Sequence, residues 1–414
     1  PNHFLNAQNN RQETYKQLSL FGDIFERVKE QYVEEISDKE LIEAAISGML
    51  QSLDPHSAYL SADDYSEMQV KTKGSFGGLG IEITLENGVV KVVSPIDDTP
   101  AFKAGLKPGD LIIGVEGESI RGLPLNEAVE KLRGPIGTKV KITVLRKDED
   151  PFDLEIIRDK IKIRSVRYEI INNVGYVRLT TFSQTTTSSM VSNIKTIKDK
   201  LGDKLEGLIL DLRNNPGGFL FSAEKIVDQF FSSKKTILIT ETKRGVRDTF
   251  FTTNKGVFRK GNLYILVNGQ SASASEVVAG AVQDNKRGTI IGRRTFGKGL
   301  VQQHLPLGGG DVVKLTTSRY YTPSGKSIQR SFSDGNEEYF NQANNLNYDD
   351  SEDINKLKIK DSSNIKYNSK DENFRGGISP DIQVKIANKS DELDKSILNN
   401  MITNFVYTYL DSNR

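Results

Sequence analysis

The sequence has no cysteine among its 414 residues, and this absence excludes a thiol nucleophile, a disulfide framework and thiolate metal sites. Histidine is almost as scarce, with only His3, His56 and His304, so a zinc site built from several histidines is not expected. The net charge of +1 gives no electrostatic reason to expect nucleic acid as a partner. No apolar run approaches the roughly 18 residues that predict a membrane-crossing helix.

The stretch around residue 270 carries the clearest chemical signal. An apolar run at 263–267 predicts a strand and 274–283 predicts a helix, and the turn of small residues between them contains Ser273. A strand, a tight turn and a helix in this order expose a serine hydroxyl at a helix N-terminus, beside N–H groups without intrahelical partners. Lys298 follows in a loop with glycine on both sides, where other backbone can approach closely.

These residues resemble the active-site pair of a known enzyme family. The run Ser271-Ala272-Ser273-Ala274-Ser275-Glu276, followed by Phe296-Gly297-Lys298-Gly299 and then Gln302, is similar to the motifs of the carboxyl-terminal processing (tail-specific) serine peptidases. These are Ser-Lys enzymes with an inserted PDZ domain, and the resemblance extends over about residues 18–330 and 376–385. It implies that Ser273 is the nucleophile, that Lys298 is the general base, and that Gln302 orients the lysine.

The residues alone leave simpler interpretations open. Ser273 and Glu276 have the spacing of a capping box, in which Ser273 would only cap the helix and contribute about 1 kcal/mol. Ser271 and Ser275 are neighbouring candidates for the nucleophile, and the family's spacing between serine and lysine favours Ser273. Lys298 must be neutral to accept a proton, so its pKa must fall from about 10.4 to roughly 7–8, which burial can cause.

Other chemistries are rejected from their sequence context. Residues 292–298 nearly form a phosphate-binding loop, but Gly299 stands where the motif requires serine or threonine. A serine–histidine pair would need His304, which we expect on a strand or in its loop. His56, beside proline in a turn, and Asp284 are both interpreted as structural.

The chain is expected to form an α/β multidomain protein of five segments. Residues 1–73 predict a helical unit that begins with a loose polar arm at 1–17. The resemblance implies a PDZ domain with a β-rich α+β fold at 74–160 and a catalytic α/β core, resembling the ClpP/crotonase-type layer fold, at 161–330. The polar residues 331–375 predict a mobile surface insertion, and residues 376–414 predict a return to the core and a final helix at 393–410.

A glycine turn at the start of the second segment is the candidate peptide-binding element. Glycines before a strand often form a plain turn, but the elements that follow have the order of the family's PDZ module. Such a turn holds a peptide's terminal carboxylate through backbone N–H groups. The residues implied are Gly78, Leu79, Gly80 and Ile81. Arg133, after the helix predicted at 125–132, either couples this domain to the active site or is an exposed helix-end arginine.

A second glycine turn is the candidate oxyanion site. The run Asp-Leu-Arg-Asn-Asn-Pro-Gly-Gly at 211–218 follows a predicted strand and is also similar to a motif of the family. The resemblance implies that the N–H groups of Gly218 and Ala274 stabilise the oxyanion. A strand-to-helix turn that uses proline and glycine for its geometry is compatible with this role.

The resemblance implies a serine endopeptidase that binds the C-terminal tail of a protein substrate in its PDZ domain and cleaves upstream. The alternative is a non-catalytic PDZ scaffold that keeps the catalytic parts as structure. No metal ion or cofactor is implied, and a homo-oligomer or an adaptor protein is a further option. Because the family is typically exported and the chain starts at Pro1, we expect a bacterial periplasmic location, with a removed signal or a membrane anchor in a segment absent from this chain.

Overall fold

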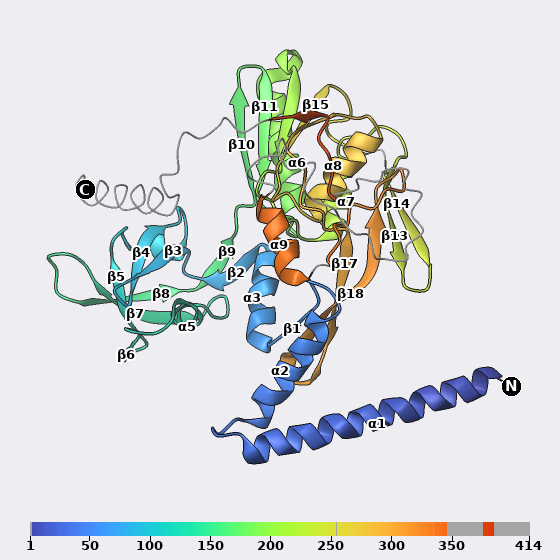
Figure 1. The fold of residues 1–414 in the computed structure, drawn as a ribbon. Coiled ribbons are helices and arrows are strands. Elements are labelled where there is room, and N and C mark those ends of the chain that lie inside the picture. The colour runs from blue at the N-terminus through green and yellow to red at the C-terminus, as the bar shows by residue number, and fades with distance from the viewer. Residues whose placement is uncertain (1, 254, 334, 346–375, 385–414) are drawn as a thin grey trace, which may run out of the picture.

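The computed structural model describes residues 2–253, 255–333, 335–345 and 376–384 (Figure 1). They form an N-terminal helical unit, a β-rich unit and an α/β core, which confirms the predicted fold class. Separate clusters of buried apolar side chains fill the β-rich unit, around Ile142, and the core, around Leu210. Within the described ranges, no helix is both long enough and apolar enough to cross a membrane.

The N-terminal unit begins with a long helix that extends away from the other elements in Figure 1. Its elements are α1 (Asn2–Gln31), α2 (Asp38–Gln51), β1 (Ala58–Leu60) and α3 (Ala62–Lys73). Ser37 and Glu40 form the predicted capping box of α2, because each accepts the backbone N–H of the other in its side chain. The prediction of a loose arm at 1–17 was wrong, because α1 is continuous from Asn2. Glutamine, glutamate and lysine in this stretch are good helix formers.

The β-rich unit is a small sheet with two helices and a separate two-stranded ribbon. Its elements are β2 (Ser75–Gly78), β3 (Ile81–Glu86), β4 (Val89–Pro95), α4 (Pro100–Lys103), β5 (Leu111–Val115), β6 (Glu118–Ser119), α5 (Leu125–Leu132), β7 (Lys139–Leu145), β8 (Phe152–Ile157) and β9 (Asp159–Lys162). The strand order is β3-β4-β5-β7-β8, with β6 on β5, so β3 is an edge strand. The chain enters and leaves this unit through the antiparallel pair β2–β9.

The core contains a largely parallel sheet with the order β10-β11-β12-β15-β16-β19. These strands are β10 (Val166–Ile171), β11 (Val174–Leu179), β12 (Gly207–Asp211), β15 (Asn262–Val267), β16 (Thr289–Gly292) and β19 (Ile382–Gln383). All neighbours from β11 to β19 are parallel. The connecting helices include α6 (Thr186–Leu201), followed by the 3-10 turn η1 (Gly202–Lys204), α7 (Leu220–Asp228) and α8 (Ala274–Asp284). The loops after the strands therefore gather at one edge of the sheet.

A second sheet joins the N-terminal unit to the core. Its strands are β13 (Thr236–Thr242), β14 (Arg247–Phe251), β17 (Leu300–Pro306) and β18 (Val312–Tyr321), with the 3-10 turn η2 (Gly308–Gly310) between the last two. β1 pairs with β18, where Ala58 lies opposite Lys314. This pairing brings the turn before β1, residues 54–57, to the part of the core that carries Lys298.

From its composition we expected the polar segment at 331–375 to lack packed structure, but part of it is packed on the core. It contains the helix α9 (Asn336–Asn345), and Tyr339 on this helix is only 1% exposed. This buried aromatic side chain fixes α9 to the core, although apart from Phe340 the other residues of the helix are polar or small. The rest of the predicted insertion and the helix predicted at 393–410 lie outside the described residues. The return to the core is seen in β19, which pairs with β16.

Candidate active site

Ser273 occupies the turn between β15 and α8. Its backbone has φ +55° and ψ −113°, which is outside the regions that non-glycine residues usually occupy. The turn is held by Ser271, whose Oγ accepts the Asn268 N–H at 3.0 Å and donates to the Leu212 carbonyl at 2.8 Å. The surrounding structure thus maintains Ser273 in a strained conformation at a helix N-terminus, which is a common feature of functional turns.

The two neighbouring serines are part of the protein interior. Ser271 and Ser275 are fully buried, and the Ser275 hydroxyl donates to the Asn215 carbonyl at 2.9 Å. Ser273 is only partly buried. Since a nucleophile must reach a substrate, the geometry favours Ser273 over both alternatives.

Glu276 connects the serine turn to the lysine loop. Its Oε2 accepts the backbone N–H groups of Ser273 and Lys298, each at 2.8 Å. Its Oε1 accepts the Thr295 hydroxyl and the Gly297 N–H, each at 2.6 Å. Complete burial raises the pKa of Glu276 to about 7, although these four donors favour the carboxylate. Glu276 is therefore more than the capping residue that its spacing predicted.

Tyr320 makes a second connection between the same two segments. Its hydroxyl, at the end of β18, lies within hydrogen-bond distance of the carbonyl oxygens of Ser273 and Lys298. The side chain is buried, and burial raises the pKa of Tyr320 far above its usual value. The neutral phenol can therefore donate its proton to these carbonyl groups at any physiological pH. Neither contact could be read from sequence spacing.

Lys298 has the electrostatic environment that a general base requires. Burial, together with the positive charge of Lys314, lowers the pKa of Lys298 to about 8, while the charges of Glu276 and Asp54 oppose the shift. Lys314 also has a lowered pKa because it is partly buried. A lysine with a pKa near 8 is neutral in a useful fraction of molecules at neutral pH.

The turn before β1 reaches the lysine from the N-terminal unit. Asp54 accepts the N–H of His56 at 2.8 Å and the hydroxyl of Ser57 at 2.6 Å. His56 in turn lies 2.9 Å from the Tyr339 hydroxyl through its Nε2. Burial and the nearby charge of Lys298 lower the pKa of His56 to about 3. His56 is thus a neutral hydrogen-bonding residue, in agreement with its structural interpretation.

Tyr339 covers this turn from α9. Besides His56, its ring packs edge-on against Phe296, with ring centroids 5.6 Å apart, and against Phe332. Phe296 lies two residues before Lys298. The helix predicted to be part of a mobile insertion therefore contacts the lysine loop.

Gln302 has a different partner from the one that the family resemblance implies. It lies on β17, and its Nε2 donates to Thr316 Oγ1 on β18 at 3.2 Å. The Thr316 N–H donates to the Ser57 hydroxyl at 3.1 Å. In this structure Gln302 is therefore connected through Thr316 to Ser57, the hydrogen-bond partner of Asp54. Its expected role in orienting Lys298 stays a prediction.

The second glycine turn lies directly against the serine. Gly217 has φ +100°, and a Cβ at this position would lie 2.9 Å from both the Ser273 Cβ and the Ala274 nitrogen. Gly218, with φ +143°, is exposed beside it. Ala274 is the first residue of α8, so its N–H has no acceptor within the helix. The structure thus places Gly217 directly against Ser273 and Ala274, and Gly218 is the next residue along the chain, so the oxyanion role of Gly218 and Ala274 stays a prediction.

The predicted peptide-binding residues lie at the start of the β-rich unit. Gly78 ends β2 and Ile81 begins β3, while Leu79 and Gly80 form the turn between them. The carbonyl of Leu79 accepts the Ala101 N–H at 2.9 Å, which anchors the turn to α4. Ile81 therefore opens the edge strand of the sheet.

Arg133 follows α5 and faces the ribbon that leads to the core. Its guanidinium carbon lies 4.8 Å from the centre of the Phe76 ring on β2. This cation–π contact connects the C-terminal end of α5 to the ribbon β2–β9. Arg133 is therefore not simply a solvated helix-end arginine.

The rejected candidates have local partners. His304 is exposed on β17 and lies against the Tyr65 ring, 5.7 Å between centroids. Asp284 ends α8 and accepts the Ser324 N–H at 2.9 Å. In the described part of the chain, no group of three or more histidine or acidic side chains is placed to hold a metal ion.

Matches to known protein families agree with this organisation. Peptidase family S41 matches residues 173–335, the N-terminal domain of the activating protease CtpB matches 2–64, and the PDZ domain matches 77–156. The photosystem II D1 C-terminal processing protease is 28% identical, with a TM-score of 0.46, over 87% of this chain and 86% of that one.

Curated relatives are more similar in sequence. The carboxy-terminal processing protease CtpA of Bacillus subtilis is 37% identical over 308 residues, which are 74% of this chain and 65% of that protein. The carboxy-terminal-processing protease of Bartonella bacilliformis is 50% identical over 323 residues, 78% of this chain and 74% of that protein. Identity at this level over most of both chains places the protein in peptidase family S41, among the carboxy-terminal-processing proteases with a PDZ domain.

Proposed function

We propose that this protein is a serine endopeptidase that binds the C-terminal tail of protein substrates through its PDZ domain and cleaves them by a Ser-Lys mechanism. The observation that carries the proposal is the shared carboxylate of Glu276, which fixes the backbone of Ser273 and Lys298 at the N-terminus of α8. A nucleophile and a base on separate segments need such an anchor to keep their mutual geometry.

In the proposed acylation step, Lys298 Nζ accepts the proton of the Ser273 hydroxyl while Oγ bonds to the scissile carbonyl carbon. The electron pair displaced onto the carbonyl oxygen is stabilised by the N–H groups of Gly218 and Ala274. Lys298 then gives its proton to the leaving amine as the C–N bond breaks. Water, deprotonated by the same amine, releases the acyl fragment and restores Ser273.

The pKa of Lys298 supports its role as the base. At a pKa of about 8, roughly one molecule in ten carries a neutral amine at pH 7, compared with fewer than about one in a thousand for free lysine. The first proton transfer can therefore take place near neutral pH, and the protonated amine remains acidic enough to protonate the leaving group.

Tail recognition is proposed for the turn from Gly78 to Ile81 and the edge strand β3. A peptide that adds to an exposed strand forms main-chain hydrogen bonds, and a glycine turn at the strand's start accommodates its carboxylate. We expect an amidated peptide to bind more weakly than the free acid, because it lacks the charge that the N–H groups favour. Equal affinity for the two forms would exclude carboxylate recognition.

Assembly and location complete the proposal. Apolar side chains along α1 are exposed, with Leu18 at 58%, Phe21 at 47% and Ile24 at 51%, and such a face suits a second copy or an adaptor protein. Light scattering of the purified chain tests this idea, and a monomer at micromolar concentration excludes self-association.

The resemblance to exported peptidases supports a bacterial periplasmic location, with or without an anchor, which cell fractionation tests.

A fluorophosphonate probe tests the peptidase proposal directly. The wild-type protein should be labelled at Ser273 and should degrade casein, whereas Ser273→Ala should do neither while keeping its fold. Ser275→Ala is a matched variant of a buried serine on the same helix. A protein that binds peptides but neither reacts with the probe nor cleaves them would be the non-catalytic PDZ scaffold instead.

A further inference from the structure

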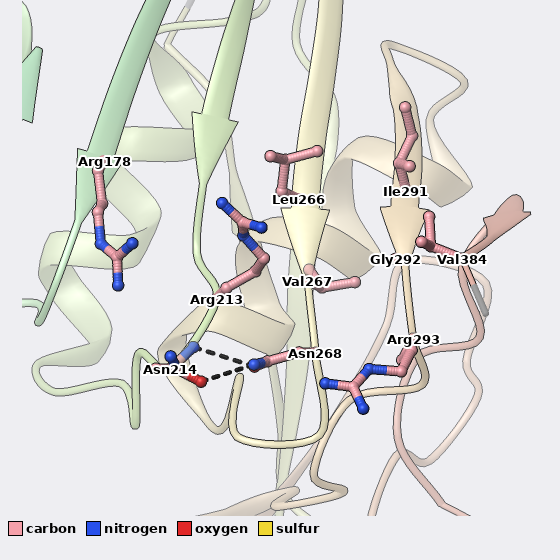
Figure 2. A pocket seen from close by; sticks show the side chains of 10 residues that line it. All are labelled: Arg178, Arg213, Asn214, Leu266, Val267, Asn268, Ile291, Gly292, Arg293 and Val384. Carbon is pink, nitrogen blue, oxygen red and sulfur yellow. Dashed lines mark hydrogen bonds between the residues drawn. The ribbon is translucent and has the colours of Figure 1, made fainter. Parts of the chain in front are cut away.

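A pocket opens where the strands of the parallel sheet end. It has a volume of about 440 Å³ and is lined from β11, β12, β15, β16 and the residue after β19 (Figure 2). This volume is within the usual range for small-ligand sites. Ligands of open parallel sheets commonly bind at the carboxyl ends of the strands, so both the place and the size suit a ligand.

The lining is rich in arginine. Arg178 comes from β11, Arg213 follows β12, and Arg293 follows β16. Among the described residues that line the pocket, none is acidic. Figure 2 shows Arg178 and Arg293 on opposite sides of the pocket, with the side chains of Asn214 and Asn268 between them. The pocket therefore offers several hydrogen-bond donors and a positive potential to an anion.

One carboxylate outside the lining orients part of this cluster. Asp211 is fully buried, and its two oxygens accept the Arg213 Nε and Nη2 at 2.9 and 2.7 Å. Arg178 Nη1 lies farther away, 3.7 Å from Asp211 Oδ2. Burial opposes the charge of Asp211, but hydrogen bonds from Arg213 and Tyr176 hold its pKa below the usual value. One carboxylate thus lies beside two guanidinium groups, those of Arg178 and Arg213, so the positive charge of these two arginines exceeds the negative charge of Asp211.

The remaining surface of the pocket is apolar. Leu266 and Val267 come from β15, Ile291 comes from β16, and Val384 stands at the rim. A small inorganic anion would leave these side chains without contacts. An aliphatic chain of a few carbons that ends in a carboxylate would pack against them and reach the guanidinium groups.

The pocket wall is connected to the catalytic turns. The Asn268 side chain accepts the Asn214 N–H at 3.0 Å and donates to the Asn214 side chain at 2.6 Å. The next residue, Asn215, accepts the Ala272 N–H at 3.0 Å, and Ala272 precedes Ser273. A bound ligand would therefore contact the residues that support both the oxyanion turn and the serine turn.

We propose that this pocket binds a carboxylate carried on a short aliphatic chain, with Arg178 and Arg293 as its principal donors. Two sources have this chemistry: an acidic side chain of the polypeptide substrate, or a free dicarboxylate of similar size. The first source rests on the proposed peptidase function, whereas the second does not. In both cases, occupation of the pocket positions the loop that follows β12.

Calorimetry on the full chain tests the proposal, with Ser273→Ala as the background so that no probe is cleaved. The free probe is glutarate, and the polypeptide probe is a heptapeptide with one central glutamate, blocked at both ends to avoid PDZ recognition. Its neutral counterpart contains glutamine. We expect glutarate or the glutamate peptide to bind, the glutamine peptide to bind at least about tenfold more weakly, and Arg178→Gln or Arg293→Gln to weaken binding by a similar factor.

Arg259→Gln is the control and should leave binding unchanged. Arg259 is exposed and lies before β15, at the end of that strand that is away from the pocket. Binding of the peptide alone assigns the pocket to the substrate, and binding of glutarate alone assigns it to a free carboxylate. The proposal is wrong if neither probe binds at millimolar concentration, or if binding survives both arginine substitutions. These outcomes do not depend on cleavage, so they are distinct from a failure of the peptidase proposal, which the fluorophosphonate probe detects.

Discussion

Ser273 and Lys298 donate their backbone N–H groups to the same carboxylate oxygen, Oε2 of Glu276, each at 2.8 Å. The Tyr320 hydroxyl contacts the carbonyl oxygens of the same two residues. Two buried side chains thus fix two separate segments, the serine turn and the lysine loop, to each other. Both side chains are buried, so we interpret them as positioning residues whose loss should affect the geometry of the proposed Ser273–Lys298 dyad.

Glu276→Gln should strongly reduce activity. An amide of the same size can accept hydrogen bonds only at its oxygen, so its NH₂ group faces two N–H or O–H donors in a fully buried site. We expect a loss in kcat/KM of about 100-fold, the usual effect of displacing a catalytic group by about 1 Å. Urea unfolding should show a decrease of roughly 2–5 kcal/mol in the free energy of unfolding.

The pH profile separates this positioning role from general damage. The negative charge of Glu276 raises the pKa of Lys298, so its removal should lower that pKa and move the acid limb of the residual activity to lower pH. Glu224→Gln, at another partly buried carboxylate of the core, is the matched control and should leave activity and profile unchanged. An active Glu276→Gln enzyme with a wild-type profile would contradict the anchor role.

Lys314 should set the pH dependence of the wild-type enzyme. In the proposed mechanism the active form has a neutral Lys298, so kcat/KM should rise with pH and level off above the Lys298 pKa of about 8. The charge of Lys314 lowers that pKa. Lys314→Gln should therefore raise it, decrease the neutral fraction at pH 7, and move the acid limb to higher pH.

Lys314→Arg keeps the positive charge and is the conservative comparison. Its profile should remain close to that of the wild type, even if the larger side chain lowers the maximal rate. The measurement is kcat/KM from about pH 5 to 10, a range that contains the lowered pKa. If both variants shift the profile equally, then packing rather than charge is the cause.

Tyr339 should be needed for activity although it belongs to a polar segment. Tyr339→Ala removes a buried ring that packs on Phe296 and bonds to His56, and a core aromatic truncation typically costs about 3–5 kcal/mol. Because Phe296 lies close to Lys298, kcat/KM should fall as well. Tyr339→Phe loses only the hydrogen bond, so it should cost about 1 kcal/mol and retain most activity.

Deletions separate α9 from the residues that follow it. Removing 331–375 eliminates Tyr339 and should reproduce the defect of Tyr339→Ala. Removing only 346–375, whose composition is polar without apolar periodicity, should leave activity unchanged. An active enzyme that lacks all of 331–375 would show that α9 is dispensable, as the composition alone first suggested.

The sequence predicted the parts of the site that lie in continuous motifs. Ser273, Lys298 and Gly218 each belong to a run whose glycines and small residues require a particular turn, and such local requirements are visible in spacing. Asp54 and Tyr339 are different, because they reach the site through β1 and α9 from distant parts of the chain. Tyr339 and Phe340 are adjacent aromatic residues in a polar run, and such an isolated pair has no periodic pattern that would predict which of them is buried.

The last prediction concerns Arg133 and Phe76, which connect α5 to the ribbon β2–β9. The arginine stacks on the ring at 4.8 Å, and this ribbon is the covalent route between the PDZ domain and the core. If the contact transmits tail binding, Arg133→Ala should lower the cleavage of a tail-bearing protein while the affinity for its C-terminal peptide persists. Phe76→Leu removes the ring but keeps the arginine, and it should cause the same uncoupling.

Arg121→Ala, at an exposed position of the same domain, is the control and should change neither quantity. Peptide affinity and turnover must be measured on the same preparations, because only their separation distinguishes coupling from weaker binding. A short substrate without a tail should be cleaved equally by the wild type and by Arg133→Ala, since it does not use the PDZ domain. If affinity and turnover are both unchanged in Arg133→Ala, the stacking contact is a local stabilising feature of the ribbon and has no part in catalysis.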